Sequence, residues 1–121
     1  MEQKSFQYSF AQKNGMVVVS LSGEMNGFVL PALEACRHEL FSKSDVRQVV
    51  LFFQGVPEIS SDAVPWIAQI QRDIRLRKAE VRLVALNSNC KERFIKMGVV
   101  RGTEVAEDLK SALMSFVKIA A

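Results

Sequence analysis

The chain has few of the residues on which metal and disulfide chemistry depends. Among its 121 residues it has two cysteines, Cys36 and Cys90, and one histidine, His38. Two cysteines are too few for a disulfide framework, and neither has a second Cys or His at the spacing of a zinc site. We therefore predict reduced, structural thiols and no metal centre.

Long apolar segments are also missing. No hydrophobic run approaches the roughly 20 residues that a membrane-spanning helix needs. The amino-terminal stretch MEQKSFQYSF lacks the basic and apolar segments of a secretory signal. We expect a cytoplasmic protein that does not insert directly into a membrane.

The chain has little excess charge of either sign. Its formal net charge is +3, with 24% charged and 49% hydrophobic residues. This excess is well below the Lys and Arg density of a dedicated nucleic-acid binder, so we predict no nucleic-acid partner. The length suits one compact unit, and we predict a single domain over residues 1–121.

The apolar pattern indicates about five strands. Phe6, Tyr8 and Phe10 alternate with polar residues, and the turn signal Asn14-Gly15 separates them from the run MVVVSL. This pattern predicts a hairpin. The nearly continuous apolar runs at 46–56 and 79–86 are typical of strands covered on both faces, the first of them central in the sheet. A short strand is expected around Val105.

Helical periodicity fills the segments between these strands. The third helix is expected to have its cap at Ser88 or Asn89 and to end at Gly98, and Asp108 is expected to cap the last helix. The order ββαβαβαβα predicts an α/β fold, a mostly parallel mixed sheet of about five strands with four helices. The predicted inward residues are Val29, Leu33, Cys36 and Leu40, then Ala63, Ile67, Ile70 and Ile74, and then Leu109, Leu113, Phe116 and Val117.

The stretch PEISSDAVPWI, residues 57–67, forms a strand-to-helix corner with three small oxygen-bearing side chains. Any of Ser60, Ser61 and Asp62 could cap the helix that follows. Pro65 is tolerated only in the first helical turn, so the cap should lie at Asp62 or later, which leaves Ser61 just outside the helix. The residues alone leave two interpretations: these side chains cap the helix, or one of the hydroxyl groups is a site of modification.

Three segments resemble the STAS domain family, which includes bacterial anti-sigma-factor antagonists and domains of anion transporters and stress-sensing complexes. LSGEMNGFVLPALEA resembles the second strand and first helix of that family, which often begin with GELD. VVLFFQGVPEISSDAVPWI resembles the third strand and its Asp-Ser-Ser-Gly signature, and VRLVALNSNCKERFIKMGV resembles the fourth strand and third helix. The resemblance runs from Phe6 to Phe116 and implies the STAS fold.

The resemblance also implies a function and a site. The first serine of the family signature is a phosphoacceptor and falls on Ser61. It implies binding to a serine kinase and anti-sigma factor of the histidine-kinase-like ATPase type, with a serine phosphatase as a further partner. A phosphoserine before a helix would meet free N–H groups and the positive end of the helix dipole. The predicted docking surface comprises Asn26, Gly27, Glu58, Ser60, Ser61, Asp62, Ala63 and Trp66.

The signature departs from the family pattern around Ser61. Where the family has Asp, Ser, Ser and Gly, this chain has Ser60, Ser61, Asp62 and Ala63, and Asn26 replaces the aspartate of GELD. Asp62 at the helix cap would satisfy the same N–H groups that a phosphate would use, and its charge would repel a phosphate. A binding module that is never phosphorylated therefore stays open.

Three classes of function follow from these observations. The first is a regulatory module switched by phosphorylation of Ser61. The second is a non-catalytic STAS subunit of a lipid or anion transport complex or of a stress-sensing complex, without chemistry on Ser61. The third is a small enzyme, which we do not predict, because no acid–base pair, activated nucleophile or phosphate-binding glycine loop can be identified. We accordingly predict no catalytic residues and no cofactor.

Overall fold

The computed structural model describes residues 6–98 and 104–119, the last three without their side chains. Its centre is one five-stranded sheet in the order β1-β2-β3-β4-β5. β1 is antiparallel to β2, and the other neighbouring pairs are parallel. The strands are β1 (Gln7–Lys13), β2 (Met16–Ser22), β3 (Gln48–Gly55), β4 (Glu80–Val84) and β5 (Val105–Ala106).

Four α-helices connect or follow these strands. They are α1 (Leu30–Ser42), α2 (Val64–Leu76), α3 (Ser88–Lys96) and α4 (Leu109–Ile119), and a short 3-10 helix, η1 (Gly27–Val29), leads into α1. The predicted order ββαβαβαβα and the central place of β3 are thus confirmed, with η1 as an addition. None of these helices, within the described part of the chain, is both long and apolar enough to span a bilayer.

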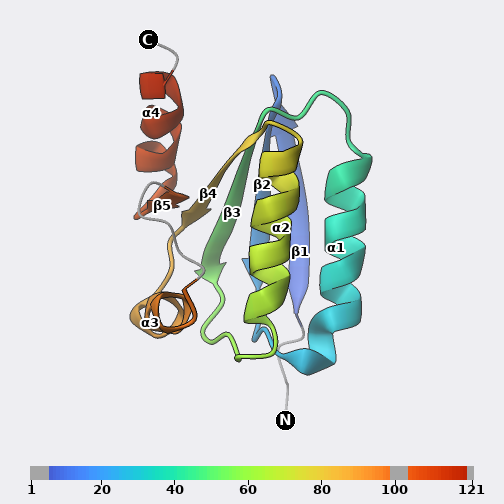
Figure 1. Ribbon diagram of the computed structural model, residues 1–121, viewed down its shortest axis with the longest axis vertical. Helices are drawn as coiled ribbons and strands as arrows, with labels where there is room; N and C mark the ends of the chain where they lie inside the picture. The colour runs from blue at the N-terminus through green and yellow to red at the C-terminus, as the bar shows by residue number, and fades with distance from the viewer. Residues whose placement is uncertain (1–5, 99–103, 120–121) are drawn as a thin grey trace.

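The two faces of the sheet carry unequal cores, because alternate strand residues point to opposite sides. Val17, Val19, Val49 and Leu51 belong to the large cluster that also contains the buried residues of α1 and α2. Val50 and Val84 face the other way and pack with Ala112 and Phe116 of α4. Figure 1 shows α1 and α2 side by side on one face of the sheet and α4 next to β5, and the contacts of Ala112 and Phe116 place α4 on the opposite face.

Helix α2 buries its predicted apolar stripe, and polar side chains near its carboxyl end bind a neighbouring segment. Ile67, Ile70 and Ile74 are all buried, as predicted. Arg75 makes two hydrogen bonds of 2.8 Å to the carboxylate of Glu104, which also accepts a 2.9 Å bond from the buried amide of Gln71. These bonds attach the helix to the segment that enters β5.

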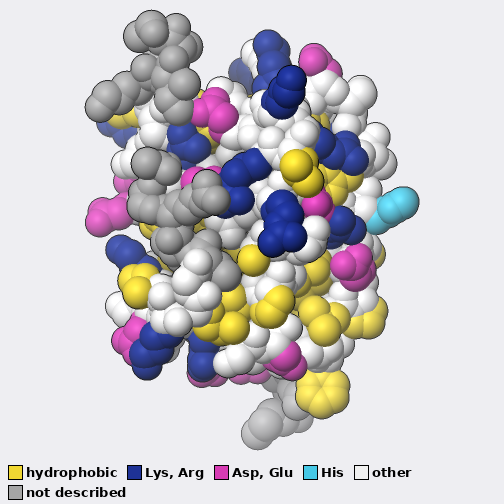
Figure 2. All heavy atoms as spheres, in the orientation of Figure 1, with side chains coloured by type: hydrophobic (Ala, Val, Ile, Leu, Met, Phe, Trp, Pro, Cys, Tyr) yellow, Lys and Arg dark blue, Asp and Glu magenta, His cyan; other side chains and the backbone are white. Residues whose placement is uncertain are grey.

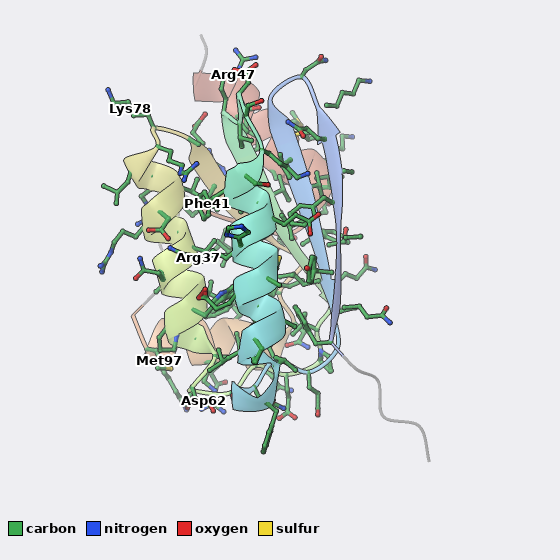
Figure 3. The ribbon with its side chains drawn as sticks, turned by 90° about the vertical axis from the view of Figure 1, so that its right-hand side faces the viewer. Arg37, Phe41, Arg47, Asp62, Lys78 and Met97 are labelled. Carbon is green, nitrogen blue, oxygen red and sulfur yellow. The ribbon has the colours of Figure 1, made fainter. Side chains whose placement is uncertain are left out.

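A second set of contacts joins α1 to α2. Arg37 of α1 forms an ion pair with Asp73 of α2. The guanidinium group of Arg77 lies 4.4 Å from the ring centroid of Phe41, and its Nη1 donates a 3.2 Å bond to the Phe41 carbonyl. Figure 3 shows Arg37 and Phe41 at the junction of the two helices, well above Asp62.

Of three further expectations about the helices, one is wrong, one is confirmed, and one lies outside the described residues. The cap of α3 is Asn87, whose side chain accepts a 2.8 Å bond from the Cys90 N–H, and not Ser88 or Asn89. Asp108 does cap α4, as predicted, through a 2.8 Å bond from the Ser111 N–H. The predicted inward side chain of Val117 lies outside the described residues.

Candidate docking corner

The two family motifs meet beyond the carboxyl ends of β2 and β3. Met25 and Ile59 form an isolated parallel bridge. The Met25 N–H donates to the Glu58 carbonyl at 3.1 Å, and the Ser60 N–H donates to the Met25 carbonyl at 2.8 Å. Carboxyl ends of neighbouring parallel strands share one edge of a sheet, where ligands and partners usually bind in such folds. This bridge brings the segment around Asn26 against the corner around Ser61.

Ser61 lies in the turn before α2, and its side chain is exposed, so the predicted place just outside the helix is confirmed. The cap residue of α2 is Ala63, which gives the helix no side-chain cap. The N–H groups of Ala63 and Val64 instead donate to the Ser60 carbonyl at 3.1 and 3.3 Å. Pro65 has no N–H to offer.

This turn corrects two expectations about the start of α2. The side chain of Asp62 does not cap the helix; it accepts a hydrogen bond from the Ser60 hydroxyl. The N–H groups that a phosphate was expected to find free are already bonded at Ala63 and Val64. Accommodation of a charge on Ser61 therefore has to come from the helix dipole and from side chains.

Asp62 also lies against the 3-10 helix. A Cβ placed on Gly27 would overlap the Oδ2 atom of Asp62, so the absence of a side chain at position 27 leaves room for this carboxylate. Asn26 begins η1 as its cap, with Oδ1 accepting a 2.9 Å bond from the Phe28 N–H. Figure 3 shows Asp62 at the lower end of the molecule, beside the start of α1.

Arg93 of α3 is the cation that reaches Ser61. Its Nη1 donates a hydrogen bond of 3.0 Å to the Ser61 Oγ across 32 positions of sequence. Arg93 also lines a small hollow together with Glu24, Asn26, Glu58 and Ser60. Sequence reasoning missed this residue, because nothing near Arg93 in the sequence resembles a site.

An apolar side chain beside the corner was missed as well. Phe28 of η1 is 95% exposed, and it lines an open groove with Phe6, Val29, Pro57 and Asn87. Figure 2 shows hydrophobic side chains gathered over the lower ends of α1 and α2, while Lys and Arg gather over the upper end of α2. An exposed aromatic ring next to polar groups is typical of protein-binding surfaces.

Two residues of the predicted docking surface are not presented at the surface. Ala63 is fully buried, and Trp66 is only 6% exposed, because both belong to the core side of the corner. Their side chains cannot contact a partner in this conformation. The other predicted residues are exposed or half-buried at the corner: Asn26, Gly27, Glu58, Ser60, Ser61 and Asp62.

The two cysteines are free and buried, as predicted for structural thiols. Burial, followed by the nearby Glu39 carboxylate, raises the pKa of Cys36 to about 12. Burial and then Glu58 raise the pKa of Cys90. Both thiols are therefore held protonated and unreactive. Across residues 6–98 and 104–119, no three His, Cys, Asp or Glu side chains gather in the way a metal ion requires.

Comparison with known proteins identifies the class to which this fold and corner belong. The STAS domain family matches residues 7–112. This match covers most of the chain, and the chain therefore belongs to the STAS domain family. The resemblance noted in the sequence is thus confirmed. No curated protein sequence matches the chain significantly.

Several solved structures share the fold. An anti-sigma factor antagonist from Mycobacterium paratuberculosis has a TM-score of 0.80 at 21% identity, over 92% of this chain and 93% of that chain. The anti-sigma factor antagonist SpoIIAA in its unphosphorylated form has a TM-score of 0.71 at 18% identity, over 94% and 96%. The phosphorylated form of SpoIIAA from Bacillus has a TM-score of 0.68 at 16% identity, over 93% and 99%.

The same fold is found in a protein of another functional class. A sulfate transporter family protein from Wolinella succinogenes has a TM-score of 0.72 at 14% identity, over 92% of this chain and 93% of that chain. At these identities the structural likeness concerns the fold. The function has to be argued from the corner itself.

Proposed function

We propose that this chain is a non-catalytic regulatory module of the anti-sigma-factor antagonist type, which acts in the cytoplasm by binding a serine kinase and anti-sigma factor through the corner. Ser61 is the phosphoacceptor. The kinase is of the histidine-kinase-like ATPase type, and a serine phosphatase restores the unmodified form. One observation carries this proposal: the Ser61 hydroxyl is exposed in the turn before α2 and caps no helix.

The reaction on Ser61 would be supplied by the kinase and its nucleoside triphosphate. The Ser61 Oγ forms a bond to the γ-phosphorus, the bond from that phosphorus to the bridging oxygen breaks, and ADP leaves with the bonding electrons. The hydroxyl proton passes to a base of the kinase. The corner contributes an acceptor whose approach the core does not block, because Ser61 and Asp62 are exposed.

The change in charge explains how such a modification could end a complex. A phosphoserine carries about −1.5 to −2 charges at neutral pH. A partner surface fitted to a neutral hydroxyl would have to leave that charge desolvated or beside a like charge, at a cost of roughly 2 to 5 kcal/mol. The neighbouring carboxylates Asp62 and Glu58 already give the corner acidic character. The affinity of the complex would fall by several powers of ten at the upper end of this range.

Mass spectrometry and substitution test the proposal together. The protein is recovered from its native cell, its phosphate is mapped, and the co-purified ATPase is incubated with radiolabelled ATP and either the native chain or Ser61→Ala. We expect label on the native chain and none on Ser61→Ala. We also expect Ser61→Ala to keep the partner and Ser61→Asp to release it.

A matched control is Ser42→Asp, which adds the same charge at an exposed serine at the far end of α1. This substitution should leave partner binding unchanged. Equal binding by the native chain, Ser61→Ala and Ser61→Asp would overturn the phosphorylation switch. Label that persists in Ser61→Ala would move the acceptor to another residue.

The carboxylate beside the acceptor favours a second candidate function. Asp62 hydrogen-bonds the Ser60 hydroxyl, and its charge opposes a phosphate on Ser61. The chain would then be a permanently unmodified STAS subunit of a transport or stress-sensing complex that uses the same corner. Recovery of transporter subunits with unmodified Ser61, in a complex that Ser61→Asp leaves intact, would favour this candidate.

A further inference from the structure

We propose that Arg93 binds the phosphate on modified Ser61, so that α3 holds the phosphoserine side chain against the domain. This inference rests on the proposed function, because it concerns the phosphorylated form of the same site. The observation behind it is the 3.0 Å hydrogen bond from Arg93 Nη1 to Ser61 Oγ. The atom that would receive the phosphoryl group is already in contact with a guanidinium group.

The chemistry of the two groups suits this role. An arginine guanidinium is planar and permanently charged, and it binds phosphate oxygens through two parallel N–H groups. The N–H groups of Ala63 and Val64 are already bonded to the Ser60 carbonyl, so these two backbone donors are not free for a phosphate. Arg93 supplies side-chain donors and a full positive charge beside the Ser61 Oγ.

The geometry of α3 prepares Arg93 for this contact before any modification. Asn87, the cap of α3, donates from Nδ2 to the Pro57 carbonyl at 2.9 Å, which attaches the helix to the loop that leads into the corner. Phe94, next to Arg93, is fully buried with its ring centroid 5.9 Å from that of Phe53. Little order therefore has to be created when the phosphate arrives, and less of the binding energy is lost.

The charged groups around the phosphate act in opposite directions. Asp62 lies next to Ser61 in the chain, and Glu24 and Glu58 share the small hollow with Arg93. These three carboxylates disfavour the dianion, whereas Arg93 favours it. A variant at position 93 changes one of these effects and leaves the three carboxylates in place.

Phosphorus NMR measures this effect directly. The full chain is produced with phosphoserine incorporated at position 61 during translation, so that no kinase is needed, and the phosphate resonance is titrated between pH 4 and 8. The second pKa of the phosphate is about 6 when unperturbed. We expect it to be about 0.5 higher in Arg93→Gln than in the native background, a modest difference because Arg93 is exposed.

Two further variants make the test specific. Arg93→Lys keeps the charge and should retain part of the effect. Lys91→Gln removes one positive charge from the same helix, but position 91 is two residues away and points to another side of α3. The Lys91→Gln titration should match that of the native background. Circular dichroism of each variant checks that it is folded.

The outcomes separate this inference from the proposed function. If Arg93→Gln titrates as the native background does, Arg93 does not bind the phosphate, whether or not phosphorylation controls a partner. An equal shift in Lys91→Gln would also overturn the inference, because the effect would be general screening. If the native cell never phosphorylates Ser61, the proposed function fails, and the titration still reports whether Arg93 can hold a phosphate there.

Discussion

The two ends of α2 differ in how they are held. Near the carboxyl end, Arg75 and Gln71 bind the Glu104 carboxylate, and Asp73 pairs with Arg37 of α1. The amino end has no side-chain cap, and its turn contributes exposed Ser61 and Asp62 to the surface. The carboxyl end is thus bound to other elements through several charged and amide side chains, whereas the turn at the amino end presents polar side chains to the solvent.

This difference suits the proposed function, in which the charge at the corner changes and the fold does not. The middle of α2 is anchored by the fully buried Ile67 and Ile70, so the helix axis does not depend on the polar groups at its amino end. Substitutions near the carboxyl end should therefore change stability. Substitutions at the amino end should change binding with little effect on stability.

The largest effect is expected from Glu104→Ala. Removal of this carboxylate leaves the buried Gln71 amide and the Arg75 guanidinium without the acceptor that they share. We expect a loss of about 2 kcal/mol in the free energy of unfolding, measured by urea denaturation.

The matched control for Glu104→Ala is Glu92→Ala, which removes an exposed carboxylate paired with Lys96 at 3.3 Å. That change should cost less than about 0.5 kcal/mol, because the pair is in water. Equal costs for the two variants would show that the bonds to Glu104 stabilise the domain no more than an exposed ion pair does.

A smaller effect is expected from Gly27→Ala. The added methyl group would displace the exposed Asp62 carboxylate and so disturb its bond with the Ser60 hydroxyl, at a cost of only about 0.5 kcal/mol, because this side chain can move into solvent. In an Asp62→Ala background the same substitution should cost almost nothing, and the double-mutant cycle measures this coupling. Additive costs would show that Gly27 and Asp62 do not interact.

Ser61→Ala should have almost no effect on stability. The hydroxyl is exposed and caps no helix, and its hydrogen bond with a described side chain is the one from Arg93. We expect the free energy of unfolding, measured by urea denaturation, to change by less than about 0.5 kcal/mol. A cost above about 1 kcal/mol would identify Ser61 as a structural turn residue and weaken its proposed role as a modifiable group.

The start of α4 gives a reference for a helix end that is capped by a side chain. The Ser111 backbone N–H, its side chain and nearby Lys110 lower the pKa of Asp108 below the ordinary value of 3.8. The charged Asp108 carboxylate therefore stabilises the folded state fully above pH 3.8. This stabilisation is lost as the pH falls through the lower pKa that Asp108 has in the folded state.

The expected result is a stability difference that depends on pH. Asn caps a helix about as well as Asp but does not titrate. The advantage of the native chain over Asp108→Asn should therefore shrink as the pH is lowered below 3.8, as followed by urea denaturation at several pH values. A difference that is constant with pH would contradict the role of the carboxylate charge.

Much of the fold could be predicted from local patterns. The turn at Asn14-Gly15, the apolar run around Val50 and the stripe of Ile67, Ile70 and Ile74 all predicted elements that the structure contains. Helix caps were harder to predict, because adjacent polar residues compete. Asn87 caps α3 although Ser88 and Asn89 are chemically suited, since Asn87 also reaches the Pro57 carbonyl.

The candidate site was less predictable, because its groups come from three distant segments. Ser61 was found through its motif and its position before Pro65. The motif did not predict the burial of Trp66, since a tryptophan at the margin of an apolar stripe can point to either side. Nor did it reveal Phe28 as an exposed ring or Arg93 as a contact of Ser61.

Periodicity, turn residues and the position of Pro65 were sufficient to assign the α/β order and to place Ser61 before a helix, because these effects act over a few neighbouring residues. The environment of Ser61 was not contained in that local information. The bridge from Met25 to Ile59 and the contact of Arg93 with Ser61 arise because parallel strands bring their carboxyl ends to one edge of the sheet. Residues separated by 32 positions become neighbours only when the sheet has formed.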